Sequence, residues 1–128
     1  MSALFFEDLT VGQSADLTRT VDEAAIQAIA VVSGDHNPVH LDEAFAATTQ
    51  FKGRIAHGML SAAYISALIA GKLPGPGAIY LGQTLTFKRP VKFGVEVTVT
   101  ATIISLDAEK PCAVLSKVCT VGGKAVLD

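Results

Sequence analysis

The chain has 128 residues, of which half are hydrophobic and 17% are charged, and its formal net charge is -2. This length suits one compact domain over residues 1–128, because a chain of this size buries roughly two-thirds of its surface on folding. The apolar content excludes a disordered chain, and the acidic balance with few aromatic residues argues against a nucleic-acid-binding protein.

The start of the chain and its apolar segments predict neither secretion nor membrane insertion. The first eight residues carry two acidic residues and no basic one, unlike a signal peptide. The longest apolar segment, residues 59–70, is shorter than the roughly 20 residues of a membrane span. Cys112 and Cys119 are seven residues apart in a strand-like segment, so they should point to opposite faces and form no disulfide. We therefore expect a cytoplasmic protein without a membrane partner.

Capping residues and helix breakers predict the elements of the first half. Residues 15–20 read as a short strand, and Asp22 is a good N-cap for the helix that follows. Gly34 should end that helix, because glycine readily adopts the left-handed conformation. Residues 35–38 are then expected to form a turn, since the proline at its end lacks an N–H group and disfavours helical geometry in the residue before it. A second short helix is expected over residues 42–49.

The second half combines one apolar helix with several strands. Residues 57–70 predict a helix that is apolar on every side, so it should be buried all round. Beyond it, apolar residues alternate with polar ones over residues 79–88, 95–103 and 113–121, which is typical of strands. The expected class is α+β, with an antiparallel sheet wrapped around the helix.

The most polar segment, SGDHNPVH at residues 33–40, holds a carboxylate, two imidazoles and an amide. Because the glycine and the proline should keep this segment out of a continuous helix, a turn can bring Asp35 and His40 together. A carboxylate beside an imidazole is the usual pairing for acid–base catalysis. The alternative is a solvated polar loop, which composition alone favours.

The three histidines invite a metal interpretation. His36 and His40 are four residues apart, and His57 would supply a third ligand. That spacing needs a continuous helix, which Pro38 should interrupt, and no cysteine lies nearby. We therefore expect no metal site.

Other candidates lie at the start of the apolar helix and at a later turn. Gly58 should present a bare N–H at the positive end of the helix, where it can hold an oxyanion, although tight packing explains such a glycine equally well. His57 beside it and Ser66 two turns later both have ordinary structural explanations. Lys88 and Arg89 form either a solvated rim or a contact with an anionic ligand.

Three segments together resemble a known family. SGDHNPVHLDEAFA, then HGML about 20 residues later, then IYLGQTLTFKRPV are similar to the (R)-specific enoyl-CoA hydratases of the MaoC-like group. The resemblance runs from about Val11 to Gly123 and favours a catalytic pair over the solvated loop. It implies a hot-dog fold, in which an antiparallel sheet wraps a long central helix, and a homodimer whose sheets join side by side. Relatives continue into a final strand where this chain ends at Asp128, so either a trimmed chain or a short sheet edge is expected there.

The resemblance also implies a reaction, the reversible hydration of a trans-2-enoyl-CoA to the (R)-3-hydroxyacyl-CoA. The residues that it places in catalysis are Asp35 and His40 as the acid–base pair, the N–H of Gly58 as the oxyanion donor, and the hydroxyl of Ser66. The expected substrate-binding residues are Asn37, which orders the turn, His57, Ile69 in the acyl pocket, and Lys88 and Arg89 near the coenzyme A phosphates. No metal or bound cofactor is implied, because coenzyme A arrives as part of the substrate.

Two other functions are compatible with the same fold. A hot-dog acyl-CoA thioesterase would direct water to the carbonyl carbon. A non-catalytic acyl-CoA-binding subunit is the other alternative; loss of either Asp35 or His40 would have favoured it, and both are present. The sequence leaves open both the acyl-chain length and the pathway, which is either fatty-acid breakdown or the supply of monomers for polyhydroxyalkanoate.

Overall fold

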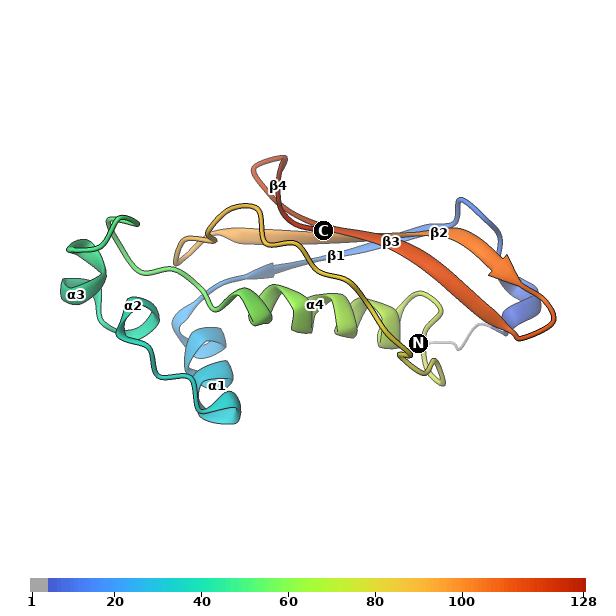
Figure 1. The fold of residues 1–128 in the computed structure, drawn as a ribbon, viewed down its shortest axis with the longest axis horizontal. Helices are drawn as coiled ribbons and strands as arrows, with labels where there is room; N and C mark the ends of the chain where they lie inside the picture. The colour runs from blue at the N-terminus through green and yellow to red at the C-terminus, as the bar shows by residue number, and fades with distance from the viewer. Residues whose placement is uncertain (1–4) are drawn as a thin grey trace.

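The computed structural model describes residues 5–128. The elements in chain order are a short 3-10 helix η1 (Phe6–Asp8), β1 (Ser14–Thr20), α1 (Glu23–Ser33), α2 (Pro38–Leu41), α3 (Glu43–Ala47), α4 (Gly58–Gly71), β2 (Glu96–Asp107), β3 (Cys112–Val121) and β4 (Lys124–Leu127). The four strands form one antiparallel sheet in the order β1-β2-β3-β4. Helix α4 lies along one face of this sheet, and α1 to α3 gather near the end where α4 begins (Figure 1). This confirms the expected α+β arrangement of a sheet against a helix.

Local signals set the bounds of α1. The side chain of Asp22 accepts a hydrogen bond from the backbone N–H of Ala25 at 2.9 Å, which caps the helix start. Gly34 ends the helix in the left-handed conformation with φ of 80°. Both ends agree with the sequence prediction.

The core forms between α4 and the sheet. Along the first part of β2, buried apolar residues alternate with less buried threonines, as the sequence predicts, and the buried residues are Val97, Val99, Ala101 and Ile103. The facing side of α4 buries Leu60, Ala62, Ile65 and Leu68. Each large aliphatic side chain buried this way contributes roughly 1.5–3 kcal/mol relative to exposure, so this layer fixes where the helix start lies.

The expectation that α4 is buried all round is wrong for the chain by itself. Among the described residues, the sheet covers one side of the helix and the opposite side remains open. Met59 is 56% exposed, and Ser66 lies on the exposed side as well. The apolar composition of the helix therefore exceeds what this chain's own sheet can cover.

The predicted strand over residues 79–88 is also wrong over most of its length. Only its end pairs with the sheet: Thr86 and Asp128 exchange backbone hydrogen bonds, and Phe87 forms an isolated bridge with Leu127. Ile79 and Leu81 are about four-fifths exposed, at 81% and 80%. Among residues 5–128, the part of this segment before Thr86 forms no backbone pairing with a strand.

No helix within residues 5–128 combines the length and the apolar character that crossing a bilayer requires. Both cysteines are free thiols. The beginning of the chain, which the sequence predicts is not a signal peptide, lies partly outside the described residues.

Candidate active site

The polar segment after α1 is ordered by its own side chains. The backbone N–H of Asn37 donates to Oδ1 of Asp35, and the Asn37 side chain accepts from the N–H of Val39, both at 3.1 Å. This second bond caps α2, whose first residue is Pro38. The prediction that Gly34 and Pro38 keep this segment out of one continuous helix is therefore confirmed. The new helical turn that begins at Pro38 and carries His40 was not predicted.

Asp35 and His40 face each other across a short gap. Oδ2 of Asp35 lies 4.0 Å from Nε2 of His40, and the two side chains are 50% and 10% exposed. The backbone carbonyl of Ile55 lies 2.8 Å from Nδ1 of His40. Since a carbonyl can only accept, this bond places the proton on Nδ1 and leaves the lone pair of Nε2 directed toward the carboxylate.

His57 supports this pair from the N-cap of α4. Its Nε2 lies 2.9 Å from the backbone carbonyl of Asp35, and its ring stacks on that of His40 with centroids 3.8 Å apart and an interplanar angle of 28°. Its Nδ1 is buried and has no hydrogen-bond partner in the described chain. His57 thus contacts both members of the pair, through a backbone bond and through ring stacking.

These three residues also bring possible metal ligands together. One ligand atom each from Asp35, His40 and His57 lies within 4.8 Å of the others, whereas His36 is exposed and lies outside the group. Metal-bound imidazoles must aim their lone pairs at one point. The stacking of the two rings does not by itself aim their lone pairs at one point, so the closeness of these atoms alone does not make a metal site. The expected lack of a metal stays a prediction.

The start of α4 meets His40 in a pocket of about 310 Å³. Gly58 is the first residue of α4, so its N–H has no acceptor within the helix. A β-carbon at Gly58 would lie 2.8 Å from Cε1 of Phe87, which leaves no room for a side chain there. Ser61 also lines the pocket and was missed in the sequence analysis, although its position one turn after Gly58 places it on the same helix face.

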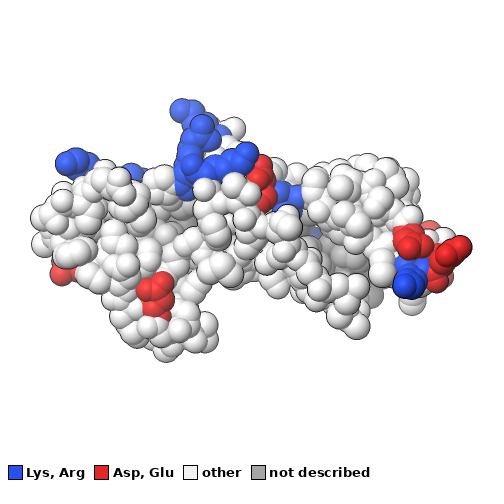
Figure 2. Space-filling model, in the orientation of Figure 1, with Lys and Arg blue, Asp and Glu red and all other residues white. Residues whose placement is uncertain are grey.

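Lys88 and Arg89 line the same pocket. Nζ of Lys88 forms an ion pair with Asp128 at 2.9 Å, and Arg89 donates to the backbone carbonyl of Ala125 at 2.7 Å. Both side chains are exposed, and basic side chains gather along the upper edge of the molecule in Figure 2. The pocket therefore has a polar, mainly basic rim.

Ser66 and Ile69 are not brought to this pocket within the chain. Ser66 follows Gly58 by eight residues, which is about 12 Å along the helix axis. Ile69 lines a separate, larger cavity of about 890 Å³ between residues 76–84 and 111–115. Their roles as a catalytic hydroxyl and an acyl-pocket residue stay predictions.

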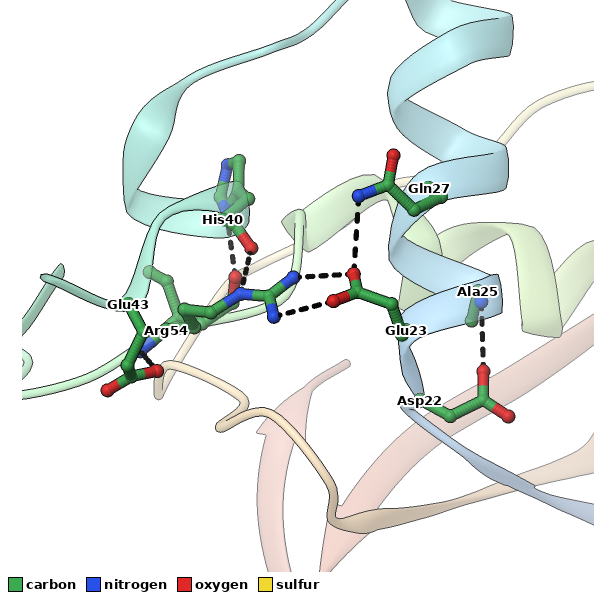
Figure 3. Close-up of polar contacts among 8 residues, drawn as sticks. Asp22, Glu23, Ala25, Gln27, His40, Glu43 and Arg54 are labelled. Atoms are coloured by element: carbon green, nitrogen blue, oxygen red, sulfur yellow. Dashed lines mark hydrogen bonds and ion pairs between the residues drawn. The ribbon is translucent and has the colours of Figure 1, made fainter. Parts of the chain in front are cut away.

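Arg54, which no sequence pattern singled out, is buried at 9% exposure. Its Nε donates to the backbone carbonyl of His40 at 2.7 Å, and its two terminal nitrogens donate to the two carboxylate oxygens of Glu23 at 2.9 and 2.7 Å (Figure 3). Hydrogen bonding to Arg54 lowers the pKa of Glu23, and the same bonds raise the pKa of Arg54. Glu23 and Arg54 are 31 positions apart in the sequence, so no local sequence pattern indicates their pairing.

Residues 8–117 match the family described as MaoC like domain. The chain belongs to this family. It is 51% identical to an (R)-specific enoyl-CoA hydratase of Rhodospirillum rubrum, over 97% of this chain and 86% of the relative. It is 48% identical to an (R)-specific enoyl-CoA hydratase of Aeromonas caviae, over 91% of this chain and 88% of the relative.

Two solved structures of R-hydratases agree with this fold. The R-hydratase PhaJ1 from Pseudomonas aeruginosa, in the unliganded form, superimposes with a TM-score of 0.92 at 52% identity, covering 96% of this chain and 79% of that one. The (R)-hydratase of A. caviae involved in PHA biosynthesis also gives a TM-score of 0.92, at 46% identity over 94% and 92% of the two chains. The hot-dog fold that the sequence resemblance implies is confirmed.

Proposed function

We propose that this MaoC-like protein reversibly hydrates trans-2-enoyl-CoA to (R)-3-hydroxyacyl-CoA. The observation that carries the proposal is the geometry of Asp35, His40 and Gly58, in which two proton acceptors face each other near a bare helix N-terminal N–H. Close relatives that bear the name (R)-specific enoyl-CoA hydratase support the same reaction.

The 4.0 Å between Asp35 and His40 suits one water molecule that donates a hydrogen bond to each. As the water oxygen adds to the β-carbon, Asp35 takes one proton as general base. The pair then returns a proton to the α-carbon from the same face. The water is thereby divided into the hydroxyl on one carbon and the hydrogen on the other.

The N–H of Gly58 meets the thioester oxygen, on which negative charge builds as the enolate forms. Its place at the positive end of α4 strengthens this contact. A preorganised donor of this kind is worth about 3 kcal/mol of transition-state stabilisation. The reaction moves protons and transfers no electrons, and we propose that it needs neither a metal nor a redox cofactor beyond the coenzyme A of the substrate.

The substrate's ends have separate candidate sites. Lys88 and Arg89 lie on the rim of the pocket, where their charge suits the phosphates of coenzyme A. The apolar cavity beside Ile69 suits an acyl chain. The free thiols of Cys112 and Cys119 fit a reducing cytoplasm, which is our proposed location.

We also propose a homodimer. The exposed side of α4 and the segment before Thr86 together present apolar side chains that residues 5–128 do not cover, among them Met59, Ile79 and Leu81. A second copy would cover them and bring new side chains toward the exposed Ser66. Sedimentation equilibrium should give twice the chain mass, and a monomer at micromolar concentration would contradict the dimer.

The test uses crotonyl-CoA, with loss of the enoyl-thioester absorbance followed beside a thiol reagent. Hydration predicts loss of the conjugated double bond, no free thiol, and a product of (R) configuration. Release of thiol would instead identify a hot-dog thioesterase. No change with short, medium or long enoyl chains would identify a non-catalytic acyl-CoA-binding subunit.

A further inference from the structure

Arg54 joins three parts of the chain that surround the catalytic pair. It lies just before α4, in a short stretch whose backbone pairs with residues 91–93. From there its side chain reaches Glu23 at the start of α1 and the backbone carbonyl of His40 on α2. Its guanidinium carbon also lies 4.6 Å from the centre of the Phe93 ring. Figure 3 shows the guanidinium between the α1 carboxylate and the carbonyl of His40.

The hydrogen bonds around His40 explain why the position of Arg54 matters for the His40 ring. The backbone of Ile55 donates to the carbonyl of Val39 at 3.2 Å, and its own carbonyl binds Nδ1 of the His40 ring. The Nε bond of Arg54 is a third link between the same two segments. Helix α2 has only four residues and cannot hold its orientation alone, so these three bonds act together with the stacked ring of His57 to fix where Nε2 of His40 points.

Only an arginine can make all of these contacts at once. The guanidinium has five donors in a fixed planar fork, so Nε can bind the carbonyl of His40 while both terminal nitrogens bind Glu23. A lysine at this position keeps the charge and can still pair with Glu23, but one ammonium group cannot span both partners. The side chain of Glu23 is 55% exposed, and an ion pair with such an exposed partner adds little to stability.

We infer that Arg54, oriented by Glu23, is a positioning residue that aims Nε2 of His40 at Asp35. The inference rests on the proposed function, because it assigns the pair a task in proton transfer. Arg54 itself does not line the pocket that holds His40 and Gly58. Loss of its fork should therefore misalign the proton acceptor and leave substrate binding intact.

The decisive variant is Arg54→Lys, assayed with crotonyl-CoA in the full chain. We expect kcat to fall by about 10- to 100-fold, as a misplacement of up to about 1 Å produces, while KM stays within about twofold. Glu23→Gln should show a smaller fall in kcat, since the single amide oxygen can replace only one of the two carboxylate oxygens that accept from Arg54. Glu43→Gln is the matched control: its carboxylate accepts only a long 3.4 Å bond from the Arg54 backbone, and its kcat should remain that of the wild type.

A second readout is independent of turnover. The chain has three histidines, so ¹⁵N-histidine NMR with His40→Gln for assignment can follow the Nδ1–H that binds Ile55. In Arg54→Lys this proton should exchange faster and the ring should populate both tautomers, whereas Glu43→Gln should leave the signal unchanged. If Arg54→Lys does not fold, Glu23→Gln decides by the same two criteria.

If the wild type is active, either of two results in a folded Arg54→Lys protein would overturn the inference: an unchanged kcat, or a rise in KM alone. So would an unchanged His40 signal. A wild type without hydratase activity would instead remove the proposed function, and the NMR comparison would still show whether Arg54 fixes the His40 ring.

Discussion

Gly58 offers a sharp test of how the start of α4 is packed. Its φ is not among the positive values in the chain, so alanine is allowed there by the backbone. Alanine favours a helix over glycine by up to about 1 kcal/mol. The new β-carbon would lie 2.8 Å from Cε1 and 3.0 Å from Cδ1 of Phe87, and overpacking of this kind costs about 1–3 kcal/mol. We expect Gly58→Ala to destabilise the protein by about 0–3 kcal/mol.

The double variant Gly58→Ala/Phe87→Ala separates the gain in helix propensity from the cost of the contact with the Phe87 ring. Phe87 is 53% exposed, so Phe87→Ala removes a ring that is only partly buried. In that background the clash is gone, and Gly58→Ala should stabilise by up to about 1 kcal/mol. A double-mutant cycle from urea unfolding should give a coupling free energy of about 1–3 kcal/mol. Additivity within about 0.5 kcal/mol would refute the contact as the reason for glycine.

Three further variants or probes test other parts of the structure. Because Arg54 lowers the pKa of Glu23, the ionised carboxylate stabilises the fold above its ordinary pKa of 4.5. The thermal midpoint of Glu23→Gln should therefore lie below that of the wild type at pH 7, and this difference should shrink as the pH falls below 4.5. A difference that does not depend on pH would contradict this. Burial raises the pKa of Cys119 to about 11, so a thiol reagent at pH 8 should modify only the half-buried Cys112 in the native protein. Rapid modification of both thiols would show instead that Cys119 is accessible. Ile69→Ala should shift preference toward longer acyl chains, and an unchanged chain-length profile would place the acyl pocket elsewhere.

Features that depend on neighbouring residues were predictable from the sequence. The ends of α1 follow from Asp22 and Gly34, because capping and left-handed closure are local effects. The alternation in β2 likewise predicts its buried face. The start of α2 was not predicted, because proline has two local effects and only one of them was considered. Pro38 disfavours a helix that runs through the residue before it, but it favours a helix that begins with it.

Features that depend on distant partners were not predictable in the same way. Residues 79–88 alternate like a strand, yet a strand also needs a neighbour, and only the stretch from Thr86 finds one. The apolar sequence of α4 predicts a helix that prefers burial, but it does not indicate how many sides of the helix are covered by other parts of the same chain. The pairing of Glu23 with Arg54 and the stacking of His40 on His57 arise only once the fold brings separate segments together.

The acid–base role of Asp35 is tested most directly by comparing the wild type with Asp35→Asn in the hydration of crotonyl-CoA. An amide has nearly the same shape as the carboxylate but cannot accept the proton from water. We expect kcat to fall by about 10²- to 10⁴-fold, with the circular dichroism spectrum and the thermal midpoint close to those of the wild type. A folded Asp35→Asn protein that retains wild-type turnover would show that another group is the base.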